Sequence, residues 1–248
     1  MKKNYLKEVI EKNEKLQNIL SSYFKLSKKN YGAQNLIALL YHELSFYYST
    51  KIFNKILTKY RSSKYLINPV FGHRNKILII KESTSIRRKI INFISKIFFF
   101  KKNIYLGSYI PINNFEKLKF FFSYTFKGYS IHLNNHYFFD KRIYLNQIKT
   151  IQSLIYKIHN YFNLKDKKKA FNEIDFFLKC IMQNSKTKSK EYDAIVTGTP
   201  AKFINRLNLF QGLKKNMNIV FMHSGESGFI KSFPYQFDER LFGNKIIG

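Results

Sequence analysis

Four residues, Thr197-Gly198-Thr199-Pro200, separate a short apolar run from a helical pattern and form the first candidate site. The run at 192–197 (YDAIVT) is typical of a buried strand, and residues 200–215 place apolar side chains at helical spacing. A strand-to-helix turn lies at the carboxyl end of a parallel sheet, where such sheets bind ligands. The exposed N–H groups of this turn and the helix dipole favour an anion such as phosphate. The alternative is that this turn only connects the strand to the helix. In that case Gly198 permits the turn, Thr199 caps the helix and Pro200 occupies the first helical turn.

A second corner follows the apolar run at 218–223 (NIVFMH) and consists of His223, Ser224, Gly225 and Glu226. The carboxyl ends of neighbouring parallel strands meet at one edge, so the two corners are expected to open into one crevice. His223 is a candidate catalytic base or phosphate ligand, because its pKa is close to working pH. Glu226 is a candidate proton acceptor, and Ser224 and Gly225 are candidate substrate-binding residues. The alternatives are a hydrogen-bonded, partly buried histidine and a loop carboxylate.

Asn205 and Arg206 lie in the helix that follows the first turn and complete the candidate substrate-binding set. Arginine is scarce beside lysine in this chain, and its planar fork suits a carboxylate or a phosphate. The alternative for Arg206 is an ion pair with Asp193, Glu226 or Asp238.

No metal site or resident cofactor is expected. His132 and His136 are four residues apart, but the surrounding residues 131–138 are typical of a strand or loop, where that spacing does not converge on a metal. The single cysteine, Cys180, lies on the apolar side of a predicted helix, which favours a buried thiol over a nucleophile. The sequence has no P-loop, GxGxxG, GxSxG or kinase-type motif.

The elements that must position these residues divide the chain into a helical amino-terminal segment, 1–65, and a Rossmann-like α/β domain, 66–248. Residues 33–60 are apolar around most of a helix circumference, which predicts a buried helix. From residue 76, strand patterns (76–80, 103–111, 192–197, 218–223) alternate with helical ones (83–99, 144–162, 168–182, 200–215). This alternation predicts a parallel sheet flanked by helices. The last residues, 244–248, begin a strand pattern, which suggests that the domain is incomplete at its carboxyl end.

The charge is strongly basic: 44 Lys+Arg against 15 Asp+Glu give a formal net charge of +29. Such a balance attracts nucleic acid, an anionic membrane or phosphorylated substrates. A/T-rich codon usage is favoured as the main cause of the charge, because Lys, Asn, Ile, Phe and Tyr are abundant and Trp is absent. No secretory signal or long apolar span is present, which predicts a cytoplasmic protein that can lie at the inner face of the membrane.

The segment 193–227, with its strand, Thr-Gly turn, helix, strand and His-containing corner, resembles part of the amino-terminal domain of GT-B-type glycosyltransferases that build surface polysaccharide or lipopolysaccharide. In that family a His-Gly element ends the second strand, whereas here Ser224 stands between His223 and Gly225. The resemblance covers about the last fifty residues. It implies the first half of a GT-B architecture, with the glycan or lipid-linked acceptor on this domain. The nucleotide-activated sugar donor would be a substrate bound mainly by a second domain, without which the chain would not catalyse transfer.

Two other classes stay open. A nucleic-acid-binding protein, such as a ribosomal component of an A/T-rich genome, would use the charge and the basic-aromatic segment 117–132 to stack bases. A scaffold that keeps the fold without the chemistry is the third reading.

Overall fold

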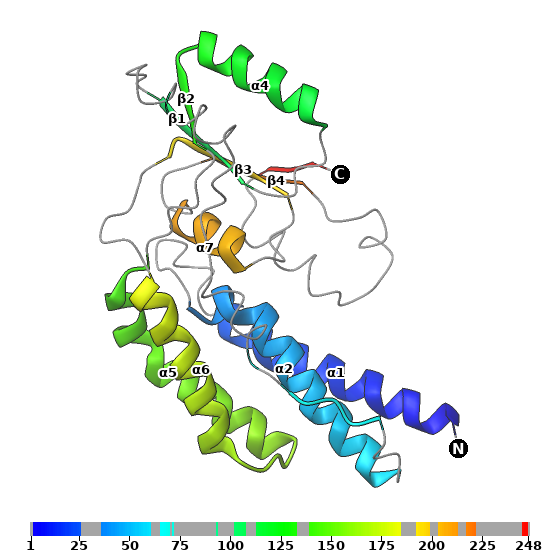
Figure 1. Cartoon of the computed structure of the whole chain (residues 1–248). Coiled ribbons are helices and arrows are strands. Elements are labelled where there is room, and N and C mark those ends of the chain that lie inside the picture. Colours follow the sequence, from blue (N-terminus) through cyan, green and yellow to red (C-terminus); the bar gives the residue numbers. More distant parts are fainter. Residues whose placement is uncertain are drawn as a thin grey trace. The chain divides into compact units, whose positions relative to one another are not determined.

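The computed structural model describes residues 2–25, 36–60, 65–69, 71, 93, 102–107, 113–132, 139–184, 192–198, 203–212, 217–221 and 245–247. The chain divides into two compact units (Figure 1). The helical unit comprises Met1–Leu78 and Asp140–Asn184, and the sheet unit comprises Ile79–Phe139 and Ser185–Gly248.

The described residues of the helical unit form four long helices: α1 (Lys2–Lys25), α2 (Leu36–Lys59), α5 (Lys141–Tyr161) and α6 (Lys167–Asn184). α2 packs against α1 and α5, and α5 packs against α6. α2 is buried over most of its length, as its apolar circumference predicts. Its amino terminus is capped from another helix, since Gln147 Oε1 of α5 accepts the Leu36 N–H at 2.7 Å.

A polar cluster lies between α1 and α2 in this otherwise apolar core. Gln17, only 7% exposed, donates from its amide nitrogen to Ser45 Oγ at 2.6 Å and accepts the hydroxyl of Tyr41 through Oε1. These bonds supply hydrogen-bond partners inside the apolar interface, where an unpaired polar group would be costly.

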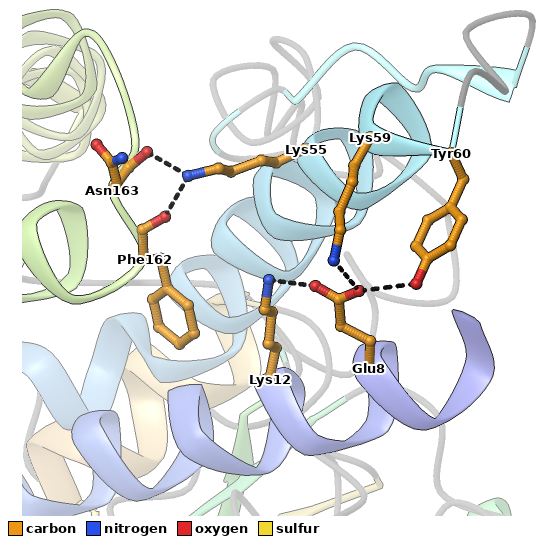
Figure 2. A network of polar contacts seen from close by, with 7 residues as sticks. All are labelled: Glu8, Lys12, Lys55, Lys59, Tyr60, Phe162 and Asn163. Atoms are coloured by element: carbon orange, nitrogen blue, oxygen red, sulfur yellow. Dashed lines mark hydrogen bonds and ion pairs between the residues drawn. The ribbon is translucent and has the colours of Figure 1, made fainter. Parts of the chain in front are cut away.

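A second polar network joins the first half of α1 to the carboxyl end of α2 (Figure 2). Glu8 accepts from Lys12 Nζ at 2.6 Å, from Lys59 Nζ at 3.0 Å and from Tyr60 Oη at 3.2 Å. The hydrogen bond from Lys12, followed by that from Lys59, lowers the pKa of the Glu8 carboxyl from 4.5 to about 2. Nearby, Lys55 donates to the carbonyls of Phe162 and Asn163, which joins α2 to the end of α5.

We expect Glu8→Gln to lower the free energy of unfolding of the helical unit by about 1 kcal/mol at neutral pH, the range for a partly exposed ion-pair network. Because the folded-state pKa of Glu8 is lowered, its contribution is present above pH 4.5 and is lost as the pH falls toward about 2. Urea unfolding followed by hydrogen exchange in α1 and α2 measures this effect between pH 7 and acid. The control is Glu11→Gln, whose carboxylate is 55% exposed and lies 3.9 Å from Lys7. If Glu8→Gln lost as much unfolding free energy as the wild type between pH 4.5 and about 2, the expectation would be contradicted.

The sheet unit contains five parallel strands in the order β2-β1-β3-β4-β5. The strands are β1 (Lys102–Leu106), β2 (Tyr129–His132), β3 (Ala194–Thr197), β4 (Met217–Phe221) and β5 (Lys245–Ile247). Helix α4 (Asn114–Phe126) packs on one face of the sheet and α7 (Phe203–Gly212) on the other (Figure 1). The α/β class with a parallel sheet, predicted from the strand-helix alternation, is confirmed.

The α4 face of the sheet holds an apolar cluster. Ile104 and Leu106 of β1, Ile131 of β2 and Val196 of β3 pack with Phe121 of α4. α4 begins at a capping box, in which Asn113 accepts the Glu116 N–H at 2.8 Å and Glu116 accepts the Asn113 N–H at 2.9 Å.

The division into units differs from the predicted boundary at residues 65 and 66. The segment Asp140–Asn184, assigned from sequence to the α/β domain, groups with the amino-terminal helices. The reason is that the apolar stripes of α5 and α6 pack with each other and with α2 rather than on the sheet. The predicted strand 76–80 lies outside the described residues, as does the predicted helix 83–99 apart from Phe93.

Candidate functional site

The carboxyl edge of the parallel sheet brings together the ends of neighbouring strands. β3 ends at Thr197 and β4 at Phe221, and Thr197 is in register with Val220. The strand order reverses between β1 and β3, because β1 is followed by β2 on one side and β3 by β4 on the other. Open parallel sheets bind ligands at such a reversal. The geometry therefore places the switch point between the ends of β1 and β3, one strand away from the predicted crevice between β3 and β4.

Gly107 and Thr197 are in close contact at this switch point. The Gly107 N–H donates to the carbonyl of Val196 at 2.8 Å, which extends the β1–β3 pairing by one residue. A Cβ atom added to Gly107 would lie 2.5 Å from Thr197 Oγ1 and 2.8 Å from Thr197 Cβ. The Thr197 side chain is fully buried. Its hydroxyl therefore packs between strands, and the backbone of Gly198, also buried, continues the corner.

Gly107 is a residue of this edge that the sequence analysis did not single out. The signal for it was present, because Gly107 ends a strand pattern in the same way as Gly198 does.

Arg206 is fully buried on α7. Its neighbours along the helix are apolar and buried, and its guanidinium carbon lies 5.6 Å from the ring centroid of Phe203, a cation–π distance. Asp193, one predicted ion-pair partner, lies at the amino end of β3. There its Oδ2 accepts the Asn103 N–H at 2.6 Å, and its own N–H donates to the Asn103 carbonyl at 2.8 Å.

A polar cluster on the sheet was also missed from sequence. His132 Nε2 of β2 lies 2.8 Å from Asn103 Oδ1 of β1, and Nε2 is the donor in this contact because an amide oxygen only accepts. Tyr192 packs against the rings of His132 and Tyr105 at centroid distances of 5.7 and 5.3 Å. The Tyr192 hydroxyl is buried and has no hydrogen-bond partner among the residues with described positions, and burial raises its pKa to about 12.

This cluster combines a buried imidazole, an amide and an unpaired phenol on adjacent strands, which is unusual in a covered parallel sheet. The signal in the sequence was weak. It consisted of polar residues at alternate positions, Asn103 on one strand and Ser130 and His132 on the next.

Several predicted site residues fall on parts of the chain without a described position. Thr199 and the whole corner from His223 to Glu226 lie outside the described residues, as does Asp238. Asn205 is placed by its backbone within α7. Of the predicted site, the structure thus places Thr197, Gly198 and Arg206, all three buried.

A separate hollow of about 590 Å³ lies in the helical unit. Its lining comes from the start and first turns of α6 and consists of Asp166, Lys168, Lys169, Asn172, Glu173 and Phe176. Tyr47 of α2 hydrogen-bonds Glu173, and burial is the main cause that raises the pKa of its phenol. Burial also lowers the pKa of Lys51. The lining mixes acids and lysines, so it does not favour a ligand of one charge.

Comparisons of the chain with protein-family models, curated proteins and solved structures give no match. Among the residues with described positions, no group of three or more His, Cys, Asp or Glu side chains is arranged to hold a metal ion. Within the same ranges, no helix has the length and apolar character needed to cross a bilayer. Cys180 is a buried free thiol, as the sequence predicts.

Proposed function

We propose that the sheet unit is the acceptor-side, amino-terminal domain of a glycosyltransferase, or a glycerol-phosphate-type transferase, of cell-surface polysaccharide biosynthesis. The observation that supports it most directly is the meeting of strand ends at the switch point, where Gly107 lies against Thr197 and Gly198 forms a buried corner. Transferases with paired Rossmann-like domains act at this edge of the sheet, which is where the GT-B resemblance places the acceptor.

The mechanism assigned to this edge is displacement at an anomeric or phosphoryl centre. The N–H groups from Thr197 to Thr199 hold an anionic group, since N–H groups before a helix favour negative charge. His223 or Glu226 takes the proton of the acceptor hydroxyl as its oxygen bonds to the anomeric carbon or phosphorus of the donor, while the bond to the donor's nucleotide breaks and the nucleotide leaves with the electron pair. The in-register pairing of β3 with β4 supports this assignment, because the chain leaves both strands at the same edge. Asn205, Ser224 and Gly225 contact substrate. Arg206 lies fully buried on α7, so it contributes positive charge to the site without direct access to solvent.

Anion binding at the edge can be tested with the intact protein and inorganic pyrophosphate, followed by the backbone amide resonances. Shifts at Gly107 and Gly198 are expected, and Gly198→Val is expected to weaken binding at least tenfold, because a side chain blocks the approach of the anion. The control is Gly128→Asn, placed at a turn with φ of 82°, where asparagine is tolerated. Shifts confined to lysine-rich helices, with the edge unaffected, would contradict the anion site.

Catalysis is tested by His223→Ala in the intact protein within its complete transferase assembly. Loss of a general base lowers the rate by about 10²- to 10⁴-fold. Transfer is measured from nucleotide-activated sugars to a lipid-linked acceptor. An unchanged rate and acceptor affinity would refute the role of His223 and leave the anion site to be judged by the amide shifts.

A nucleic-acid-binding function is the second candidate, because aromatic side chains on α4 are exposed beside lysines: Phe115 is 76%, Phe122 51% and Phe126 87% exposed. Filter binding of single-stranded RNA at increasing salt distinguishes the two functions. Tight binding that weakens steeply with salt would favour the nucleic-acid function.

A further inference from the structure

The outer face of α4 presents an aromatic stripe to solvent. Phe115, Lys119, Phe122 and Phe126 are spaced by four, three and four residues, which places them within an arc of roughly 60° on a helix. All four side chains are exposed, and the phenylalanines are 76%, 51% and 87% exposed. The opposite side of α4 packs on the sheet through Phe121, with Phe120 and Tyr124 partly buried there. The helix is therefore aromatic on both sides, although only one side is needed for the core.

One lysine without an acidic partner among the described residues, Lys119, lies within this stripe, and two more lie beside aromatic rings at the border of the α4 core. Lys127 follows the helix with its Nζ 5.6 Å from the Tyr124 ring, and Lys102 of β1 lies 5.5 Å from the Tyr129 ring. In the part of the chain with described positions, no carboxylate pairs with any of the three.

The acid at the start of α4, Glu116, is held by the capping box at the helix amino terminus. The helical unit differs from this surface, since Lys12 and Lys59 there share Glu8 and Lys179 pairs with Asp175 at 2.6 Å.

We propose that this α4 face, defined by Phe115, Lys119, Phe122 and Phe126 and followed at the end of the helix by Lys127, docks on an anionic lipid bilayer. Aromatic side chains enter the boundary between headgroups and acyl chains, and lysines bind the anionic headgroups. α4 has 13 residues and lies along the surface of the sheet, so it would rest in the plane of the interface rather than cross it.

Two other occupants fit this face less well. At roughly 200 Å² per phenylalanine, the three exposed rings offer about 430 Å², near half of the roughly 800 Å² that each partner contributes to a stable protein interface. Single-stranded nucleic acid is bound in basic grooves that follow its backbone. The exposed face of α4 is convex and carries phenylalanines, so it does not form such a groove.

The test is co-sedimentation of the intact protein with large unilamellar vesicles of phosphatidylcholine containing about 30% phosphatidylglycerol, at about 0.1 M salt. The wild type is expected to bind these vesicles and to bind pure phosphatidylcholine vesicles at least tenfold more weakly. Phe122→Ser with Phe126→Ser is expected to reduce the partition coefficient at least tenfold. Lys119→Gln with Lys127→Gln should reduce it roughly 25-fold, since one lysine near an anionic surface corresponds to about fivefold.

The matched controls change the same residue types on the helical unit. Phe176→Ser removes a phenylalanine that is 65% exposed on α6, and Lys141→Gln with Lys149→Gln removes two exposed lysines of α5. Near-wild-type binding of both controls supports the α4 face. Equal losses in the α5 lysine control would mean that overall charge causes binding, which overturns the proposal. The proposal is also overturned if Phe122→Ser with Phe126→Ser binds vesicles as well as the wild type does. It is overturned as well if the protein sediments with RNA but not with vesicles. No substrate is used, so the result is independent of the proposed transferase activity.

Discussion

Replacing Arg206 with methionine is expected to lower the free energy of unfolding of the sheet unit by about 3 kcal/mol, the range for removing a buried charged group from the contacts that satisfy it. Arg206 is fully buried, and its guanidinium carries five N–H donors. A buried cation persists only where its donors are satisfied, so its removal leaves acceptors without a donor as well as removing the contact with Phe203. Methionine fills a similar volume, which limits the loss from packing.

Arg206→Lys should recover only part of this loss, because an ammonium group cannot reproduce the five donors of the planar fork. Urea unfolding monitored by hydrogen exchange in residues 192–212 reports on the sheet unit separately from the helical unit.

Arg142→Met is the matched control for a surface arginine. Arg142 is 84% exposed and pairs with Asp140 at 2.8 Å, so a loss of no more than about 1 kcal/mol is expected. If Arg206→Met lowered the free energy of unfolding no more than Arg142→Met does, the contacts of the buried guanidinium would contribute little to stability. The buried charge would then have no structural role.

Gly107→Ala is expected to cost about 2 kcal/mol in the same measurement, within the range for overpacking a tight core. The new Cβ would meet Thr197 Oγ1 at 2.5 Å and Thr197 Cβ at 2.8 Å, and both atoms are close to the backbone of the adjacent strand. Neither atom can move far while Gly107 N–H remains bonded to the Val196 carbonyl. The strands must therefore separate at the switch point, where the proposed anion site lies.

A double-mutant cycle with Thr197→Ala tests whether this contact is the cause. Thr197→Ala removes Oγ1, the nearer of the two clashing atoms, so the double variant should be more stable than the sum of the single changes predicts. A favourable coupling of about 1 kcal/mol is expected for residues in direct contact. Strict additivity would show that Gly107→Ala acts through the backbone or the unfolded chain and not through Thr197.

The sequence determined the local elements that are now seen at the candidate site. The apolar run before Gly198 is β3, the helical pattern after Pro200 includes α7, and residues 218–221 lie in β4. These patterns are readable because a strand or helix that buries one or both faces repeats its apolar residues at a fixed local period. The parallel pairing of β3 with β4 follows from the short helical connection between them, and the structure confirms it.

The sequence could not indicate which elements would share a core. α5 and α6 have amphipathic patterns that would suit either a sheet or another helix, and in the structure they pack with each other while α5 also packs with α1 and α2. The same limit applies to α4, whose aromatic residues occur on both sides. Its pattern alone does not indicate that Phe121 faces the sheet and Phe122 faces solvent.

By itself, the sequence determined the strand–turn–helix corner at Thr197-Gly198, the parallel α/β class and the excess of positive charge, because each depends on residues close in the chain or on composition. The tertiary structure alone decided that Gly107 meets Thr197, that His132 meets Asn103 and that Arg206 is buried. These outcomes depend on contacts between residues far apart in the chain, and on which surfaces exclude water together. No local period contains that information.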